Sequence, residues 1–198
     1  MQVTNTKYYN DLPFDDYLAM PWYSFSSIKN DGTPIPVSAG MALGTRVHNY
    51  LNEPEKYDWQ DVEIVKAMAA ELRTYVGTAM QYMKKEMAFT ADFTHNGMTL
   101  PYKGRVDLLY AGRVLVDWKI LAGPLQPAID RFGYDKQLSG YCLGTATPVG
   151  LIIAFNKTKF KKSPASQCIE VKAIKPDPSF WEYQCVRLGL PASSTVNS

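Results

Sequence analysis

The spacing of apolar positions predicts helices in the first half of the chain. Residues 60–85 carry apolar side chains near every 3.6 positions, which is typical of one amphipathic helix, with a possible break at Gly77. Those positions are Val62, Val65, Ala69, Leu72 and Val76. A shorter helix is predicted up to about Asn52, with Ser38 as its candidate N-cap and Pro54 following its end.

Strands dominate the middle of the chain. Residues 86–93, 99–110 and 114–120 read as three consecutive strands, the first two joined by the turn signal His95-Asn96-Gly97. Further along, the pattern predicts a helix over 127–143, strands over 149–155 and 167–174, and a helix over 178–188. Helices followed by strands, then helix and strand again, indicate an α/β fold with a mixed central β-sheet flanked by helices.

The two ends of the chain have different compositions. Residues 1–38 are rich in aromatic residues and prolines, which predicts an irregular segment packed on the core through its rings. Residues 39–190 are expected to form a single domain, and residues 191–198 a disordered tail. With 198 residues, 46% of them apolar, the chain can bury one sizeable core.

Composition excludes several function classes. A net charge of +2 does not indicate a nucleic-acid partner, which must be argued from local clusters. The three cysteines are widely spaced, with no CxxC pair or accompanying histidine spacing, so neither zinc nor a disulfide framework is expected. We find no signal-peptide pattern and no apolar run near ~18 residues, so the expectation is a reduced, cytoplasmic protein without a membrane segment.

Charged residues interrupt the apolar hairpin GRVDLLYAGRVLVDWK, Gly104 to Lys119. A three-residue loop over 111–113 would pair Tyr110 with Val114 and place Asp107 opposite Asp117. A two-residue loop would mix charge into the apolar set. With the longer loop, one face of the hairpin carries Val106, Leu108, Tyr110, Val114, Val116, Trp118 and Ile120, and the other carries Arg105, Asp107, Asp117 and Lys119.

The two opposed aspartates suggest a cation site. Carboxylates with β-carbons ~5 Å apart repel unless one is protonated or a cation lies between them. Mg²⁺ or Mn²⁺ would resolve the repulsion between Asp107 and Asp117, and Lys119 could stabilise developing negative charge or orient an attacking water. The alternative is a surface ion pair of either aspartate with Lys119 or Arg105 on a solvated sheet face.

The hairpin resembles the catalytic motif of the PD-(D/E)xK nuclease superfamily. In that resemblance Asp107 is the first acid, Asp117 the second and Lys119 the lysine, with Val106 in place of the usual proline. The resemblance implies a restriction-endonuclease-like core.

Two flanking elements resemble the RecB-like and RecE-like branch of this superfamily. GTRVH, Gly44 to His48, is similar to its G-x-x-x-H helix, which implies that His48 is a further metal ligand. QLSGY is similar to its Q-x-x-x-Y element, which implies that Gln137 and Tyr141 contact substrate. YSFSSIKN, followed by AGMALGTRVHNYLNEPEKY, also resembles the N-terminal pattern of RecE-type exonucleases of phages and prophages.

The resemblance implies a DNA exonuclease of the RecE or lambda-exonuclease type. His48, Asp107, Asp117 and the carbonyl of Trp118 would hold Mg²⁺ or Mn²⁺, and the enzyme would process duplex ends for recombination or repair. The implied partners are DNA, a single-strand annealing protein and further copies in a homo-oligomer, all in the host cytoplasm for a phage-encoded protein. The alternatives are an endonuclease or single-strand-specific nuclease on the same site, or a non-catalytic DNA-binding module that kept the fold.

For several charged residues the sequence allows both a functional and a structural interpretation. The lysines after the strand 149–155 could meet phosphates or form a solubilising turn; they are Lys157, Lys159, Lys161 and Lys162. Glu71 and Glu86 are candidates for a further acid near the metal, although for Glu86 a solvated charge beside Lys84 and Lys85 is the favoured interpretation.

Overall fold

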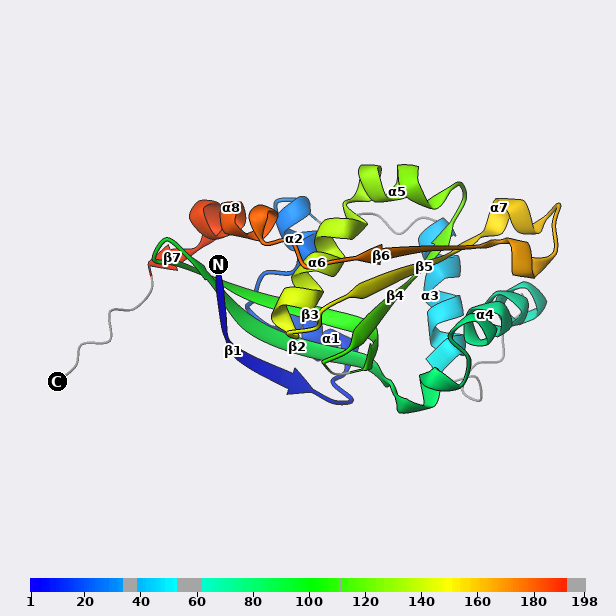
Figure 1. The fold of residues 1–198 in the computed structure, drawn as a ribbon, viewed down its shortest axis with the longest axis horizontal. Helices are drawn as coiled ribbons and strands as arrows, with labels where there is room; N and C mark the ends of the chain where they lie inside the picture. Colours follow the sequence, from blue (N-terminus) through cyan, green and yellow to red (C-terminus); the bar gives the residue numbers. More distant parts are fainter. Residues whose placement is uncertain (34–38, 53–61, 111, 192–198) are drawn as a thin grey trace.

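The computed structural model describes residues 1–33, 39–52, 62–110 and 112–191, and its centre is one β-sheet (Figure 1). Six strands lie in the order β1-β2-β3-β4-β5-β6, and β7 pairs with β3. The strands are β1 (Gln2–Tyr9), β2 (Lys84–His95), β3 (Met98–Tyr110), β4 (Val114–Leu121), β5 (Gly150–Asn156), β6 (Ile169–Ile174) and β7 (Leu190–Pro191). All pairs are antiparallel except β4–β5, which is parallel.

Helices cover this sheet. They are α1 (Phe14–Ala19), α2 (Phe25–Lys29), α3 (Ala39–Asn52), α4 (Val62–Val76), the 3-10 helix η2 (Gly77–Tyr82), α5 (Leu125–Phe132), α6 (Tyr134–Gly144), α7 (Lys157–Phe160), the 3-10 helix η3 (Ala165–Gln167) and α8 (Ser179–Leu188). The mixed α/β architecture with a central sheet flanked by helices confirms the predicted fold class. No helix of the described ranges combines the length and the apolar character needed to cross a bilayer.

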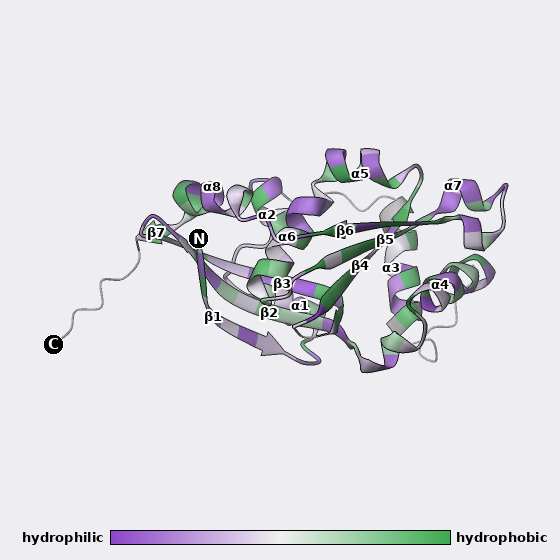
Figure 2. Cartoon of the chain, viewed as in Figure 1, coloured by the Kyte–Doolittle hydropathy of each residue, from purple (hydrophilic) through white to green (hydrophobic). Residues whose placement is uncertain are grey.

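The sheet separates two apolar clusters. One lies under α2, α5, α6 and α8, where Trp181 and Tyr141 pack with Phe89 and Tyr102 of the sheet. The other lies under α3 and α4 and contains Trp118. In Figure 2 most of β5 is hydrophobic, as expected for a strand buried on both faces. In β4 the hydrophobic residues are interrupted by Asp117 and Lys119. Most residues of both strands are buried, so β4 and β5 form the buried centre of the sheet.

Helix α6 approaches the sheet and α8 unusually closely because of two glycines. A β-carbon built on Gly140 would overlap the ring of Trp181, and one built on Gly144 would overlap the ring of Phe89. The two glycines are one helical turn apart, so they line one face of α6. This close packing fixes the position of α6 relative to strand β2 and helix α8.

The N-terminal segment is more regular than predicted. Instead of an irregular stretch, it forms the edge strand β1 and the helices α1 and α2. Buried Lys103 holds α1 in place, because its ammonium donates hydrogen bonds of 2.8, 2.9 and 2.8 Å to the carbonyl oxygens of Tyr17, Leu18 and Met20. These carbonyls lie at the C-terminal end of α1, where backbone acceptors commonly need partners from side chains; the Tyr17 carbonyl also accepts from the backbone N–H of Met20 at 3.3 Å.

Two segments predicted as helices are interrupted in the structure. The helix predicted over 127–143 is two helices, because Gly133 adopts a left-handed φ of 68° that ends α5 and starts α6. The helix predicted over 60–85 ends at Val76, which confirms the possible break at Gly77, and η2 then leads into β2 at Lys84 instead of continuing the helix. The candidate cap Ser38 and the predicted disordered tail from residue 192 onward lie outside the described residues.

Candidate active site

The β3–β4 hairpin has the predicted register. Tyr110 pairs with Val114 and Leu108 with Val116, as a three-residue loop requires; Ala111 of that loop lies outside the described residues. Continuing this register by one position places Asp107 opposite Asp117. The shorter loop, which would have mixed the faces, is excluded.

Asp107 stands where the backbone ladders on both sides are interrupted. The β3–β4 pairs end at Leu108, and the β2–β3 pairs omit the position where Asp107 would face Glu86. The carboxylate of Asp107 fills part of this opening, since its Oδ2 accepts a hydrogen bond of 2.6 Å from the backbone N–H of Trp118. The strands therefore separate at the residue that carries the first acid.

The two faces of the hairpin are less sharply divided than predicted. Leu108, Val116 and Trp118 pack under α3 and α4 as expected. Val106, which was expected beside them, packs in the cluster on the other side of the sheet together with Leu109. The face with the aspartates is therefore not a solvated surface: helices cover it, and both Asp107 and Asp117 are buried.

Helix α3 brings His48 to the aspartates. The imidazole Nδ1 lies 3.5 Å from Oδ1 of Asp107, and Nε2 lies 3.2 Å from the carbonyl oxygen of Trp118. Burial disfavours the charged imidazolium, but the Asp107 carboxylate outweighs it and raises the pKa of His48 to about 9. In turn burial, which alone would raise the pKa of Asp107, is outweighed by His48, Lys119 and the Trp118 N–H, so that this pKa is lowered.

Glu86 reaches the same place from β2, which corrects the interpretation of this residue as a solvated charge. Its backbone φ is 48°, a conformation that few residues with a side chain adopt within a strand. Its Oε2 accepts a hydrogen bond of 2.7 Å from Nε of Arg105, and Nη1 of the same guanidinium donates to the carbonyl oxygen of Leu12 at 3.1 Å. Burial and the nearby Asp107 carboxylate raise the pKa of Glu86, and Arg105 opposes this shift. The sequence does contain a signal for Glu86: the turn between β2 and β3 sets a register in which residue 86 lies opposite Asp107.

His48, Glu86 and Asp107 together form a candidate metal site. Each offers one ligand atom, and these atoms lie within 4.8 Å of one another. One imidazole nitrogen and two carboxylates, all half-buried or buried, are a donor set suited to Mn²⁺ or a similar divalent ion. The cluster differs from the predicted ligands, because it contains Glu86 and does not contain Asp117.

Asp117 forms an ion pair with Lys119. The Nζ of Lys119 lies 2.6 Å from Oδ2 of Asp117. Burial would lower the pKa of Lys119, but Asp117 and Asp107 outweigh it and raise this pKa, so Lys119 is a cation at neutral pH. Burial raises the pKa of Asp117, with the charge of Asp107 adding to the effect and Lys119 opposing it.

The α6 residue that approaches Lys119 is Tyr134, which the sequence did not single out. The Nζ of Lys119 lies 4.9 Å from the centroid of the Tyr134 ring. Tyr134 precedes Gln137 by three positions, so the two share a helical face. Gln137 donates a hydrogen bond of 2.8 Å to the hydroxyl of Tyr141. Tyr141 is buried against Phe89, which makes it first of all a core residue.

The lysines after β5 lie on and just beyond α7. The side chain of Asn156 caps this short helix by accepting from the backbone N–H of Thr158 and Lys159. Lys159, Lys161 and Lys162 are exposed and Lys157 is half-buried. Asn156 pairs with Leu121 at the end of β4, two positions beyond Lys119, in a parallel pair of strands. The lysine cluster therefore starts at the end of the sheet where β4 ends. Glu71, the other candidate acid, lies in α4 and is not part of the metal cluster.

Comparison with solved structures gives weak similarity. A phage-related exonuclease from Haemophilus somnus 129PT is 14% identical, with a TM-score of 0.45 over 86% of this chain and 90% of that one. An alkaline exonuclease from Laribacter hongkongensis is 9% identical, with a TM-score of 0.42 over 84% of each chain. No family model and no curated protein matches the sequence. Similarity at this level does not place the chain in either protein's family, so the functional assignment rests on the residues of the site.

Proposed function

We propose that this protein is a divalent-metal-dependent DNA exonuclease that hydrolyses phosphodiester bonds at duplex ends. The observation that carries the proposal is the juxtaposition of two groups in one place. His48, Glu86 and Asp107 offer ligand atoms within 4.8 Å of one another. Beside them, on the next strand, a buried aspartate holds a lysine. Ligands for a cation next to a fixed positive charge are what hydrolysis of a charged ester requires.

His48, Glu86 and Asp107 are the residues that would hold the metal ion in this proposal, with the Trp118 carbonyl close by at 3.2 Å from His48. The donor set fits Mn²⁺ better than Mg²⁺, because an imidazole nitrogen is a ligand of transition metals rather than of hard alkaline-earth ions. When bound, such an ion supplies positive charge against the phosphate and makes water acidic enough to attack at neutral pH.

The protein's own residues would divide the remaining work. Lys119 stays protonated, so its role is to stabilise the negative charge that develops on the phosphate rather than to accept a proton. Asp117 holds the ammonium in position at 2.6 Å. Asp107 links the two parts of the site, because one oxygen faces His48 while the other accepts from the Trp118 N–H. Arg105 keeps the Glu86 carboxylate turned toward the site.

The substrate in this proposal is DNA. Lysines at α7 would contact phosphates of the bound strand, as Lys157, Lys159 and Lys161 do in the interpretation of the sequence. Gln137 and Tyr141 would act from α6, Tyr141 by supporting Gln137 from within the core. We place the activity in recombination or repair, with a single-strand annealing protein as partner and a homo-oligomer as the working form, on the resemblance to RecE-type exonucleases.

The experiment that tests the proposal is digestion of linear duplex DNA carrying a 5′ or a 3′ label, with and without Mn²⁺. We expect metal-dependent shortening from one labelled end, and no cutting of closed-circular DNA. The matched variant is Asp107→Asn, which keeps an acceptor for the Trp118 N–H but removes the charge. It should abolish digestion while the protein remains folded.

The alternatives give different results in the same assay. Cutting of the closed circle would identify an endonuclease, and digestion of unpaired strands alone would identify a single-strand-specific enzyme. DNA binding without any cleavage in Mn²⁺ or Mg²⁺ would show a binding module on a nuclease-like fold. Undiminished activity of Asp107→Asn would show that the assigned site is wrong.

A further inference from the structure

We propose that Phe132 and Tyr134 form a stacking platform for an unpaired base at the end of the DNA strand that enters the site. The inference rests on the proposed function and adds to it a place where the enzyme would recognise a single-stranded end. It is carried by the geometry of the α5–α6 corner, by the cations around it and by its contact with Lys119.

The corner orients the two rings toward each other. Gly133 lies between them with a φ of 68°, which turns the chain sharply from α5 into α6. Phe132 and Tyr134 are consequently close, with ring centroids 5.5 Å apart and planes only 30° from parallel. A β-carbon at residue 133 would come within 3.0 Å of the Phe25 ring, so the glycine also lets the corner pack on α2.

Phe132 presents its ring to solvent. Its exposed fraction is 37%, and it belongs to neither of the two buried apolar clusters. Tyr134 is half-buried and packs at the margin of one cluster. The pair therefore has an anchored inner ring and a partly exposed outer ring, and a flat ligand that stacks on the exposed part of the outer ring would extend the pair by one further layer.

Cations surround the pair and point to a nucleotide as the occupant. Lys29 Nζ lies 5.2 Å and the Arg131 guanidinium 5.3 Å from the Phe132 ring centroid. Lys29 is held there by a hydrogen bond of 2.9 Å to the carbonyl oxygen of Phe132. Lys119 lies 4.9 Å from the Tyr134 ring on the inner side. Aromatic rings interleaved with fixed positive charges bind the bases and phosphates of single strands.

The platform is next to the proposed reaction centre. Lys119 contacts both Asp117, at 2.6 Å, and the ring of Tyr134. A phosphate held at Lys119 would thus have the Tyr134 and Phe132 rings within the reach of its own nucleotide's base. An unpaired base could stack there, whereas a base still paired in a duplex would carry its partner strand into the same space.

The test uses short duplexes with a single-stranded overhang that ends in 2-aminopurine, whose fluorescence falls on stacking. Binding is measured in Ca²⁺ and cleavage in Mn²⁺ with the same preparation. Wild type should quench the overhang probe, and Phe132→Leu should lose the quench and bind the overhang roughly 10-fold more weakly, the scale of one lost base–aromatic stack. Phe132→Tyr should keep both, because it keeps the ring.

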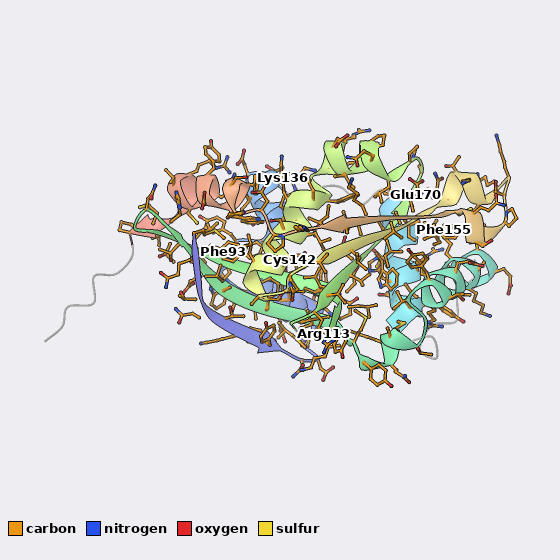
Figure 3. The ribbon with its side chains drawn as sticks, viewed as in Figure 1. Phe93, Arg113, Lys136, Cys142, Phe155 and Glu170 are labelled. Carbon is orange, nitrogen blue, oxygen red and sulfur yellow. The ribbon has the colours of Figure 1, made fainter. Side chains whose placement is uncertain are left out.

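Tyr110→Leu is the matched control. Tyr110 is 39% exposed and lies under the Arg113 guanidinium at 5.4 Å, so it offers the same kind of ring and cation. Tyr110 is the last residue of β3 and pairs with Val114, at the start of β4. In Figure 3 Arg113, the next residue but two, lies at the opposite side of the molecule from Lys136 of α6. Loss of the Tyr110 ring should leave quenching and binding of the overhang unchanged.

Each outcome separates the inference from the proposed function. If wild type digests the duplex but does not quench the probe, or if Phe132→Leu quenches like wild type, the platform is wrong and the nuclease assignment stands. If wild type neither binds nor digests DNA, both are wrong. An equal loss in Tyr110→Leu would show that any exposed ring has this effect and would overturn the platform.

Discussion

Lys119 and Asp117 form a close ion pair on strand β4, with Nζ and Oδ2 2.6 Å apart, although the pair is largely withdrawn from solvent. The cost of removing two charges from water largely offsets the attraction between them, so a buried ion pair adds little to stability. It does hold the cation in one position. That cation lies beside Asp107 of the neighbouring strand β3, one of the candidate metal ligands, which is the position that the proposed mechanism requires.

Replacing this cation should stop cleavage without removing the metal site. We expect Lys119→Met to reduce the single-turnover rate of digestion by about 10²–10³-fold, the usual effect of losing one charge that stabilises the transition state. Binding of Mn²⁺ should persist, since Lys119 is not a ligand. Lys172→Met, at an exposed position of β6, is the matched control. An unchanged rate in Lys119→Met would remove this residue from the mechanism.

The lysines around α7 should determine the salt dependence of DNA binding. Each lysine that contacts a phosphate contributes roughly 0.9 to the slope of log K against log salt concentration, so replacing Lys157, Lys159 and Lys161 by Gln should reduce that slope by about 2.7. The slope is measured by titrating labelled DNA at several salt concentrations. If the affinity changes but the slope does not, the three lysines do not meet phosphates.

Local sequence rules predict the register of the hairpin that carries Asp107 and Asp117, but they do not predict the position of Glu86. The register of the hairpin is set by loop length and by the segregation of apolar residues, both readable in the sequence, and the structure confirms it. Glu86 was not assigned correctly, because its approach to Asp107 depends on a positive φ within β2 that no propensity of glutamate favours.

Other differences also arise from tertiary contacts. The single helix predicted over 127–143 breaks at Gly133, whose left-handed conformation lets the corner pack on Phe25. The N-terminal segment was predicted to be irregular because it is rich in prolines and aromatic residues. It instead forms short elements, one of which is the strand β1, stabilised by its pairing with β2 at the edge of the sheet. In both places the decisive partner is distant in sequence.

Two glycines should respond oppositely to alanine. Gly140→Ala forces a β-carbon into the Trp181 ring, and we expect the free energy of unfolding to fall by about 1–3 kcal/mol. Gly44→Ala, in α3, meets no atom within 4 Å and should raise it by about 0.5–1 kcal/mol through helix propensity. Urea denaturation of both variants checks the pair, and a stabilised Gly140→Ala would contradict the close packing of α6.

The cysteines should be unreactive in the folded protein up to high pH. All three are buried, and burial raises the pKa of Cys142 to about 12 and that of Cys185 to about 11. A thiol-specific reagent at pH 8 should therefore label none of them until a denaturant is added. Because the unfolded chain loses these protons at lower pH than the folded one, the free energy of unfolding should fall as pH rises above about 8.5. Rapid labelling of the native protein would contradict this burial.

The proposed function requires that His48, Glu86 and Asp107 bind a divalent ion, and electron paramagnetic resonance of free Mn²⁺ measures this binding. Titration of Mn²⁺ with wild-type protein should remove the free-ion signal in proportion to the protein added. Glu86→Gln and Asp107→Asn should each weaken this uptake at least about 10-fold, whereas Glu71→Gln, an acid of α4 outside the cluster, should bind like wild type. Full uptake of Mn²⁺ by both site variants, or none by wild type, would contradict this assignment.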